Sequence, residues 1–312
     1  MRNLILLQEN RQEVSLNLQS NTEAAACELA FDPADTSRGR GSLGIPLKTY
    51  VLVNNGLLIC CTSRSKDYDN FTESVEWTCD LTKLDKCNDE NKNSWFQATF
   101  IDEIEAIVVL SHSGIIATVS PQTGDANCVG VFENGIFAAK WSPDMELLSL
   151  CTREGHGEDI RTVMLTMNTA FDIVAEVQLE AALYPSLSRQ DSNSISMCWK
   201  PDGKLVAVSS VDASDGIRRI RIYNRDSLEL HGIGLSEDGS GRIVPNITPA
   251  KIGWAGIGCS ILLTGVQTSG KKSCKIIFFE PNGLRHKDFS LRVSNRVHCS
   301  IFQDLNLSNF LL

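Results

Sequence analysis

The sequence has no apolar run that approaches the ~20 residues of a membrane helix, and no stretch keeps a helical apolar period over several turns. It also has no excess of basic residues, since 29 Lys and Arg stand against 38 Asp and Glu, which gives a net charge of -9. Without an excess of Lys and Arg, the protein lacks the positive surface that a dedicated nucleic-acid-binding protein requires. We therefore expect an acidic, essentially all-β protein with no membrane partner and no direct nucleic-acid site.

Signals for secretion are equally sparse. The apolar core near the N-terminus, Leu4 to Leu7, is shorter than the ~7 to 15 residues found in signal peptides. The 11 cysteines are an odd number without regular spacing, and most lie inside apolar runs such as Leu58 to Cys61. Such thiols behave as small buried apolar groups and suit a reducing compartment. We expect the protein to be cytoplasmic or nuclear.

The sequence does contain an internal repeat built on tryptophan. In each copy an apolar stretch ends in Trp, a turn follows, and a second apolar stretch leaves the turn. The first two copies carry Pro and Asp in the turn, and the third has lost them. The three Trp residues are 58 and 55 residues apart, which is typical of propellers and other repeat folds. The repeat residues are Trp141, Pro143, Asp144, Trp199, Pro201, Asp202, Gly203 and Trp254.

The repeat predicts four antiparallel strands per unit. In the copy at Trp199 these strands are predicted at 195–199, 205–211, 217–223 and 227–230. Further strands are predicted at 74–81, 105–110, 115–119 and 128–132, and a hairpin joins 49–53 to 57–61. We expect that hairpin to use a type I′ turn at Asn55-Gly56, which needs positive φ at both residues. A β-sandwich would not need a Trp-turn unit at constant spacing, so a WD40-type β-propeller is favoured.

A compact WD blade uses ~40 to 45 residues, which would fit seven blades into this length, but the repeat spacings of 58 and 55 residues do not allow seven. About twenty-three strands are predicted, so we expect residues 1–312 to form a single, incomplete propeller of about five to six four-stranded blades. The tail after Arg296 predicts one strand and part of a second, so the sequence is expected to stop inside a blade. Polar loops are predicted at 32–44, 63–72, 83–94, 181–194 and 236–249.

Three stretches are similar to catalytic or cofactor motifs, and we interpret each as structural. Gly39 to Gly44 matches GxGxxG, but no strand precedes it and no helix follows. Gly265 to Lys272 has Lys where a phosphate-binding loop needs Ser or Thr, and a hairpin loop is expected there. Ser111 and His112 are neighbours in a strand and point to opposite faces. No cysteine pair has zinc spacing. We expect no enzyme activity, no cofactor and no metal.

Several stretches resemble the N-terminal propeller of the Elongator scaffold subunit (IKAP) family. The resemblance is close over residues 1–7 and about 128–295 and loose over 8–127. WSPD and WKPDG are general propeller sequences, whereas their order with the MRNL start and the FFEPNGL turn is more specific. The stretches are Met1–Leu4, Gly135–Asp144, Trp199–Ser209, Ile217–Arg225 and Ile277–Leu284.

The resemblance implies a non-catalytic scaffold within the assembly that modifies wobble uridines of tRNA. Its partners would be other Elongator subunits, including the radical-enzyme subunit that carries the chemistry. The dimerisation region of the family has no counterpart in residues 1–312. The alternative hypothesis is a WD40-type adaptor of another complex, serving trafficking or ubiquitin-ligase recruitment.

Overall fold

The computed structural model describes 26–31, 47–53, 55–67, 70–84, 95–181, 195–214, 218–235, 252–255, 261–267 and 274–291. Its elements are twenty strands and two short 3₁₀ helices, η1 (Leu81–Leu84) and η2 (Gly157–Asp159). The strands form five four-stranded antiparallel sheets, each a meander of consecutive strands. The prediction of an all-β protein with four-stranded antiparallel blades is therefore confirmed.

We number the sheets as blades in chain order. Blade 1 contains β1 (Ala26–Phe31), β2 (Leu47–Val53), β3 (Leu57–Asp67) and β4 (Asn70–Asp80). Blade 2 contains β5 (Trp95–Ile101), β6 (Ala106–Ser111), β7 (Ile115–Val119) and β8 (Ala126–Val131). Blade 3 contains β9 (Ile136–Trp141), β10 (Leu147–Glu154), β11 (Arg161–Asn168) and β12 (Ile173–Leu179).

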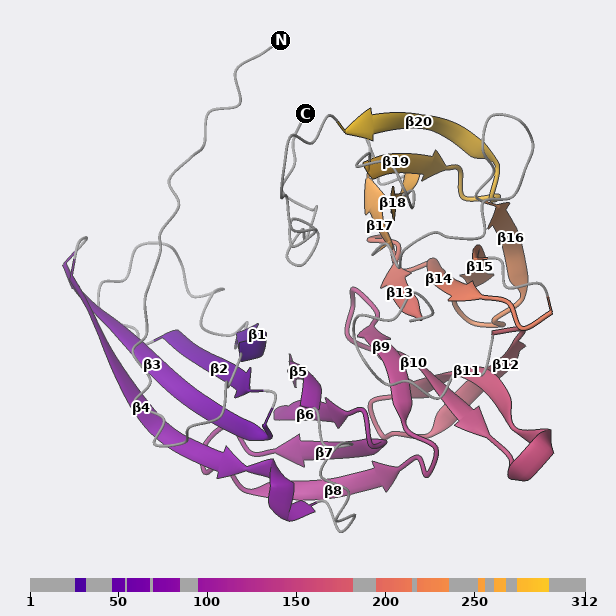
Figure 1. Ribbon diagram of the computed structural model, residues 1–312. Helices are drawn as coiled ribbons and strands as arrows, with labels where there is room; N and C mark the ends of the chain where they lie inside the picture. The colour runs from indigo at the N-terminus through magenta and orange to yellow at the C-terminus, as the bar shows by residue number, and fades with distance from the viewer. Residues whose placement is uncertain are drawn as a thin grey trace.

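The last two described blades repeat the same order. Blade 4 contains β13 (Ser196–Trp199), β14 (Leu205–Val211), β15 (Arg218–Asn224) and β16 (Leu230–Leu235). Blade 5 contains β17 (Ile252–Ala255), β18 (Ile261–Gln267), β19 (Cys274–Phe279) and β20 (Arg285–Leu291). The five sheets follow one another along an arc, with the first and fifth sheets apart (Figure 1). The described part is thus an open propeller.

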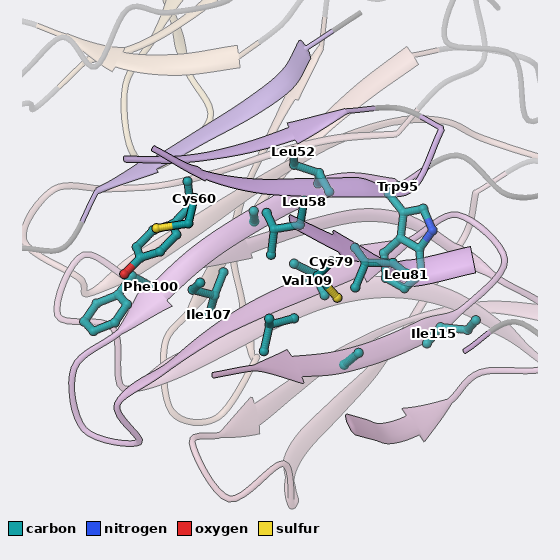
Figure 2. Close-up of a cluster of buried hydrophobic side chains, with 14 residues drawn as sticks. Leu52, Leu58, Cys60, Cys79, Leu81, Trp95, Phe100, Ile107, Val109 and Ile115 are labelled. Atoms are coloured by element: carbon teal, nitrogen blue, oxygen red, sulfur yellow. The ribbon is translucent and has the colours of Figure 1, made fainter. Parts of the chain in front are cut away.

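The hydrophobic cores lie between the blades. Each strand places alternate side chains on its two faces, so a blade buries apolar residues against both neighbours. Between blades 1 and 2, Leu52 and Leu58 meet Trp95, Ile107 and Val109 (Figure 2). Separate buried clusters fill the contacts between blades 2 and 3, 3 and 4, and 4 and 5. Packing of this kind makes each blade depend on its neighbours for burial of its apolar surface.

Four details of the sequence prediction were wrong. The predicted loop 63–72 is mostly strand, because β3 and β4 continue to pair there, with Ser63 opposite Glu73. Polar side chains do not prevent this, since the ladder is made by main-chain groups. Of Asn55 and Gly56 only the glycine has positive φ (90°), so the hairpin does not use a type I′ turn. The first strand of blade 2 (95–101) was not predicted, and the last strand of blade 4 begins at Leu230 rather than at 227.

Other predictions fall wholly or partly outside the described residues. The loops 32–44 and 236–249, the GxGxxG-like stretch and the tail after Arg296 all lie outside them. Of the loop 83–94 only 83–84 are described, as the end of η1, and of 181–194 only Ala181, which forms a bridge with Asp212. Gly265 lies within β18, paired with Ile276 of β19, so the predicted hairpin is present.

Candidate functional site

The repeat turns lie at one end of the blades. In a four-stranded meander the first and third turns fall at the same end of the sheet, opposite the second turn. The turn after each repeat Trp therefore shares one face of the propeller with the turn that enters the outermost strand. We call this surface the Pro-Asp face. In the described residues it is built from the turns 102–105, 121–125, 142–146, 169–172, 200–204, 225–229 and 280–284.

The three repeat tryptophans are separated by the fold, each into a different blade contact. Trp141 of blade 3 packs with Val108, Leu110 and Ile116 of blade 2. Trp199 of blade 4 belongs to the cluster shared with blade 3, and its indole N–H donates to the Lys140 carbonyl across the contact (3.1 Å). Trp254 lies in the cluster between blades 4 and 5. The indole rings thus join consecutive blades, and none of the three is placed to bind a ligand on the surface.

The Pro-Asp turn of blade 3 is fixed by its own hydrogen bonds. The hydroxyl of Ser142 donates to Asp144 Oδ1 (2.5 Å), and the N–H of Leu147 donates to Ser142 Oγ (3.0 Å). The N–H of Glu146 donates to Asp144 Oδ1 (3.3 Å). In blade 4 the N–H of Lys204 donates to Asp202 Oδ1 (3.1 Å), and Lys200 forms an ion pair with Asp202. Each Asp therefore shapes its turn rather than presenting a free carboxylate.

Arg225 links the Pro-Asp turn of blade 3 to blade 4. It enters from the β15–β16 turn of blade 4, forms an ion pair with Asp144, and lies 2.7 Å from Glu146 Oε2. A Cβ atom at Gly203 would lie 3.0 Å from the Arg225 guanidinium and 3.9 Å from Pro143 Cδ, so the two Pro-Asp turns are neighbours. The sequence analysis missed this role of Arg225, because no local pattern indicates a contact between residues 81 positions apart.

Partial burial opposes ionisation of Asp144, but hydrogen bonds from Arg225 and Ser142 outweigh it and lower the pKa of the carboxyl. For Asp202 burial is likewise outweighed, here by Lys200 and the N–H of Lys204, and the pKa is lowered. The pKa of Arg225 is raised by its hydrogen bond to Asp144. All three groups are charged at neutral pH.

The rest of the Pro-Asp face is acidic. Lys200, Lys204 and Arg225 are its basic residues in the described turns of blades 2 to 4, and Lys200 and Arg225 are already paired with carboxylates. A negative surface repels phosphate groups and attracts basic protein surfaces. The exposed acids of these turns outside the two repeat turns are Asp102, Glu103, Glu105, Asp125, Asp172, Asp226 and Glu229.

The opposite end holds a second ionic cluster that the sequence analysis did not identify. Asp212 is 2% exposed and accepts two hydrogen bonds from Arg221, both 2.7 Å long. Arg219 also donates to Asp212 (2.5 Å), and Arg221 reaches Glu180 at the end of blade 3 (3.2 Å). The N–H of Ala213 donates to the Glu180 carbonyl (2.9 Å). The cluster therefore ties blade 4 to blade 3 by main chain and side chain.

Candidate catalytic residues are used structurally where they are described. Ser111 Oγ lies 2.7 Å from Ser113 Oγ and accepts the N–H of Ile115 (3.0 Å). His112 lies 2.9 Å from the Ile136 carbonyl through Nδ1 and stacks on Phe96. Within the described ranges, no group of three or more His, Cys, Asp or Glu is placed to hold a metal ion.

The described segments also include no helix of the length and apolarity that would cross a membrane. Of the neighbouring cysteines Cys79 and Cys87, the Cys79 thiol is buried and Cys87 lies outside the described residues.

An arc of four-stranded meander sheets, with Trp residues between the blades and Pro-Asp turns on one face, defines a WD-type β-propeller. The family model described as "ELP1 first N-terminal beta-propeller" matches residues 1–186 and 183–308. The chain therefore belongs to this family. The match includes residues 8–127, where the resemblance in the sequence was loose.

The curated relatives are much longer than this chain. Elongator complex protein 1 of Schizosaccharomyces pombe is 29% identical over 235 residues, which cover 62% of this chain and 17% of the relative. The Rattus norvegicus protein of the same name is 24% identical over 219 residues, covering 60% and 15%. A Xenopus laevis protein named putative elongator complex protein 1 is 35% identical over 101 residues, covering 32% and 8%. The matched part is thus about a sixth of the first two relatives.

Proposed function

We propose that this propeller is a non-catalytic scaffold unit of the Elongator complex, which supports the modification of wobble uridines in tRNA. The chemistry would belong to a radical-enzyme subunit, and this chain would hold partner proteins in place. We further propose that it acts in the cytoplasm, with a nuclear location as the second possibility. The observation that carries the proposal is the family match over residues 1–186 and 183–308.

The geometry of the described residues supports a scaffold role. The side chains that could act as nucleophiles or bases, such as Ser111 and His112, are hydrogen-bonded within the fold. Buried apolar clusters join the described blades, and two ionic links, Arg225–Asp144 and Arg221–Glu180, join blade 4 to blade 3. A propeller with turns on both faces suits the binding of proteins. The acidic Pro-Asp face suits a basic protein surface better than tRNA itself.

The test is affinity purification of the natural protein through a tag added to its gene, with mass spectrometry of the recovered assembly. We expect the radical-enzyme subunit in stoichiometric amount. A strain without the gene should lose wobble uridine modification, measured by mass spectrometry of digested tRNA. The charge reversal Glu103→Lys on the Pro-Asp face should weaken recovery of the complex, while Gln178→Lys on the exposed side of β12 should not.

Two results would contradict the proposal. Recovery with trafficking proteins or ubiquitin-ligase subunits alone would favour the adaptor hypothesis. Unchanged tRNA modification in the deletion strain would separate this chain from Elongator activity. If Glu103→Lys leaves the complex intact while deletion abolishes modification, the scaffold role stands and the Pro-Asp face is not the contact surface.

A further inference from the structure

The outer strand of blade 4, β16, has two faces with different surroundings. Residues that pair directly across an antiparallel sheet place their side chains on the same face. Leu230 pairs with Tyr223, and Ile233 pairs with Arg221. Tyr223 belongs to the buried cluster between blades 3 and 4, and Arg221 reaches Glu180 of blade 3. The side chains of Leu230 and Ile233 therefore face blade 3.

The face of β16 toward blade 5 is closed. Gly232 and Gly234 lie on this face, opposite residues of β15 that belong to the cluster between blades 4 and 5. A Cβ atom at Gly232 would lie 2.4 Å from the carbonyl carbon of Asn282, and one at Gly234 would lie 3.0 Å from an atom of the Phe279 ring. The two glycines thus let blade 5 pack directly on the main chain of β16, a close approach that larger residues would prevent.

The face of β16 toward blade 3 is open. Leu230 is 49% and Ile233 42% exposed, although both side chains are aliphatic. On the facing side of the contact, Ala175 and Val177 of β12 are only half-buried against the cluster between blades 3 and 4. The contact between these two blades is therefore uncovered at its outer end. We call Leu230, Ile233, Ala175 and Val177 the rim patch.

Two acidic residues stand at the end of the rim patch that adjoins the Pro-Asp face. Asp172 directly precedes β12 and Glu229 directly precedes β16. Their carbonyl oxygens accept equivalent main-chain hydrogen bonds, from Asn168 and Asn224. Both acidic side chains are exposed, and within the described residues neither takes part in a salt bridge. The aliphatic patch is thus bordered by negative charge, which attracts Lys and Arg and repels phosphate.

We propose that the rim patch is a docking surface for a basic, aliphatic segment of a partner protein. Aliphatic side chains of that segment cover Leu230 and Ile233, and a Lys or Arg of the segment pairs with Glu229 or Asp172. The site goes beyond the scaffold function proposed above and does not depend on which complex contains the chain.

The charges favour a different protein over a second copy of this chain as the occupant. The arginines of β15 and of the turn after it are already paired with carboxylates. Arg219 and Arg221 bind Asp212, and Arg225 binds Asp144. A second copy would bring the same exposed acids to the patch, whereas its arginines in this region are committed to its own fold. A heterologous segment with its own Lys or Arg has the complementary charge.

The test places the photo-reactive amino acid benzoylphenylalanine at position 231, an exposed residue next to Leu230, in the full-length protein inside its own cells. After irradiation, cross-linked peptides are identified by mass spectrometry. We expect one partner segment that contains aliphatic residues and a Lys or Arg. Ile233→Asp should lower the cross-link yield at least about tenfold, because it places a charge where aliphatic side chains bind. Glu229→Lys should also lower the yield, because it repels the basic residue of the segment.

Val75→Asp is the matched control, because Val75 is 51% exposed on the outer strand of blade 1, and it should leave the yield unchanged. Thermal unfolding of the purified variants checks their folding, and Leu230→Asp replaces Ile233→Asp if the midpoint of the latter falls. The proposal is overturned if the folded Asp variant cross-links as well as the parent, or if Glu229→Lys has no effect. It is equally overturned if the cross-links join two copies of this chain or reach RNA.

Discussion

At the scale of single residues, the residue type at one position of the Pro-Asp turn decides whether the backbone there is strained. Equivalent turn positions with left-handed φ carry Met145 (60°) in blade 3 and Gly203 (70°) in blade 4. The left-handed region costs a residue with a Cβ roughly 1 to 2 kcal/mol, whereas glycine adopts it freely. Met145 is 40% exposed, so its side chain recovers little of this cost by burial.

The reciprocal exchange at these positions is a direct test. We expect Met145→Gly to leave stability unchanged or raise it by about 0.5 to 1 kcal/mol, because strain relief exceeds the added chain entropy of glycine. Gly203→Met should lower stability by more than about 1 kcal/mol, since the new Cβ is strained and presses on Arg225. Urea unfolding measures both. Equal destabilisation by the two variants would contradict the strain argument.

The repeat tryptophans differ in their hydrogen bonds. Trp199 donates its indole N–H to Lys140, whereas the buried Trp141 N–H makes no hydrogen bond within the described residues. Replacement by Phe removes similar volume at both sites but breaks a hydrogen bond only at position 199. Trp199→Phe should therefore cost about 1 kcal/mol more than Trp141→Phe in chemical unfolding. Equal losses would mean that the bond to Lys140 contributes nothing to stability.

At the scale of elements, blades 3 and 4 are linked by ionic contacts as well as by apolar packing. Removing one member of a buried ion pair leaves the other charged and unpaired, which costs about 3 to 5 kcal/mol. We expect Asp212→Ala to lose stability in that range, because Arg221 is only 6% exposed. Glu180→Ala should cost less than about 1 kcal/mol, since the Glu180 side chain is 77% exposed. A loss below 1 kcal/mol for Asp212→Ala would show that the buried pair of Asp212 and Arg221 contributes little to stability.

The link between the two Pro-Asp turns predicts a pH dependence. The pKa of Asp144 is lower in the folded protein than the ~3.9 of an unfolded chain, so the unfolded state binds the proton first as pH falls. Stability from this group is complete above about pH 4 and is lost as pH falls through the lowered folded pKa. Asp144→Asn should flatten the decline of unfolding free energy below about pH 4.

Asp226→Asn is the matched control, because Asp226 lies on the same turn as Arg225 but its side chain is 92% exposed. Because an exposed ion pair contributes little to stability, Asp226→Asn should change the unfolding free energy less than Asp144→Asn does. An unchanged profile for Asp144→Asn would contradict the link between blades 3 and 4.

At the scale of the whole molecule, cores that lie between blades predict cooperative unfolding. Burial, with help from Glu76, raises the pKa of the Cys60 thiol in blade 1 to about 12, and burial raises that of Cys151 in blade 3. Because the thiolate is the reactive form, both should resist alkylation in the folded state. The exposed Cys128 should react at once.

Pulse alkylation along a urea series, read by peptide mass spectrometry, tests this. We expect Cys60 and Cys151 to become reactive at the same urea concentration, because blade 2 shares a buried cluster with the blade on either side. Exposure of Cys60 at clearly lower urea would show that blade 1 opens independently of blade 3.

The sequence by itself determined the class of fold. Period-2 alternation selects strands, the Trp-turn repeat selects blades, and turn residues such as Glu280 to Gly283 fix the ends of hairpins, because these signals are local in the chain. The strand Trp95–Ile101 has weaker local signals and was not predicted. The extension of β3 and β4 was not predicted either, since main-chain pairing does not require apolar side chains.

Only the tertiary structure decided which distant residues meet. Arg225 pairs with Asp144, Asp212 is buried under Arg221, and Gly232 of β16 lies against the β19–β20 turn of blade 5. The physical reason is that these contacts depend on how one blade is placed against the next. That placement is set by the apolar packing of many side chains between blades and not by any single stretch of sequence.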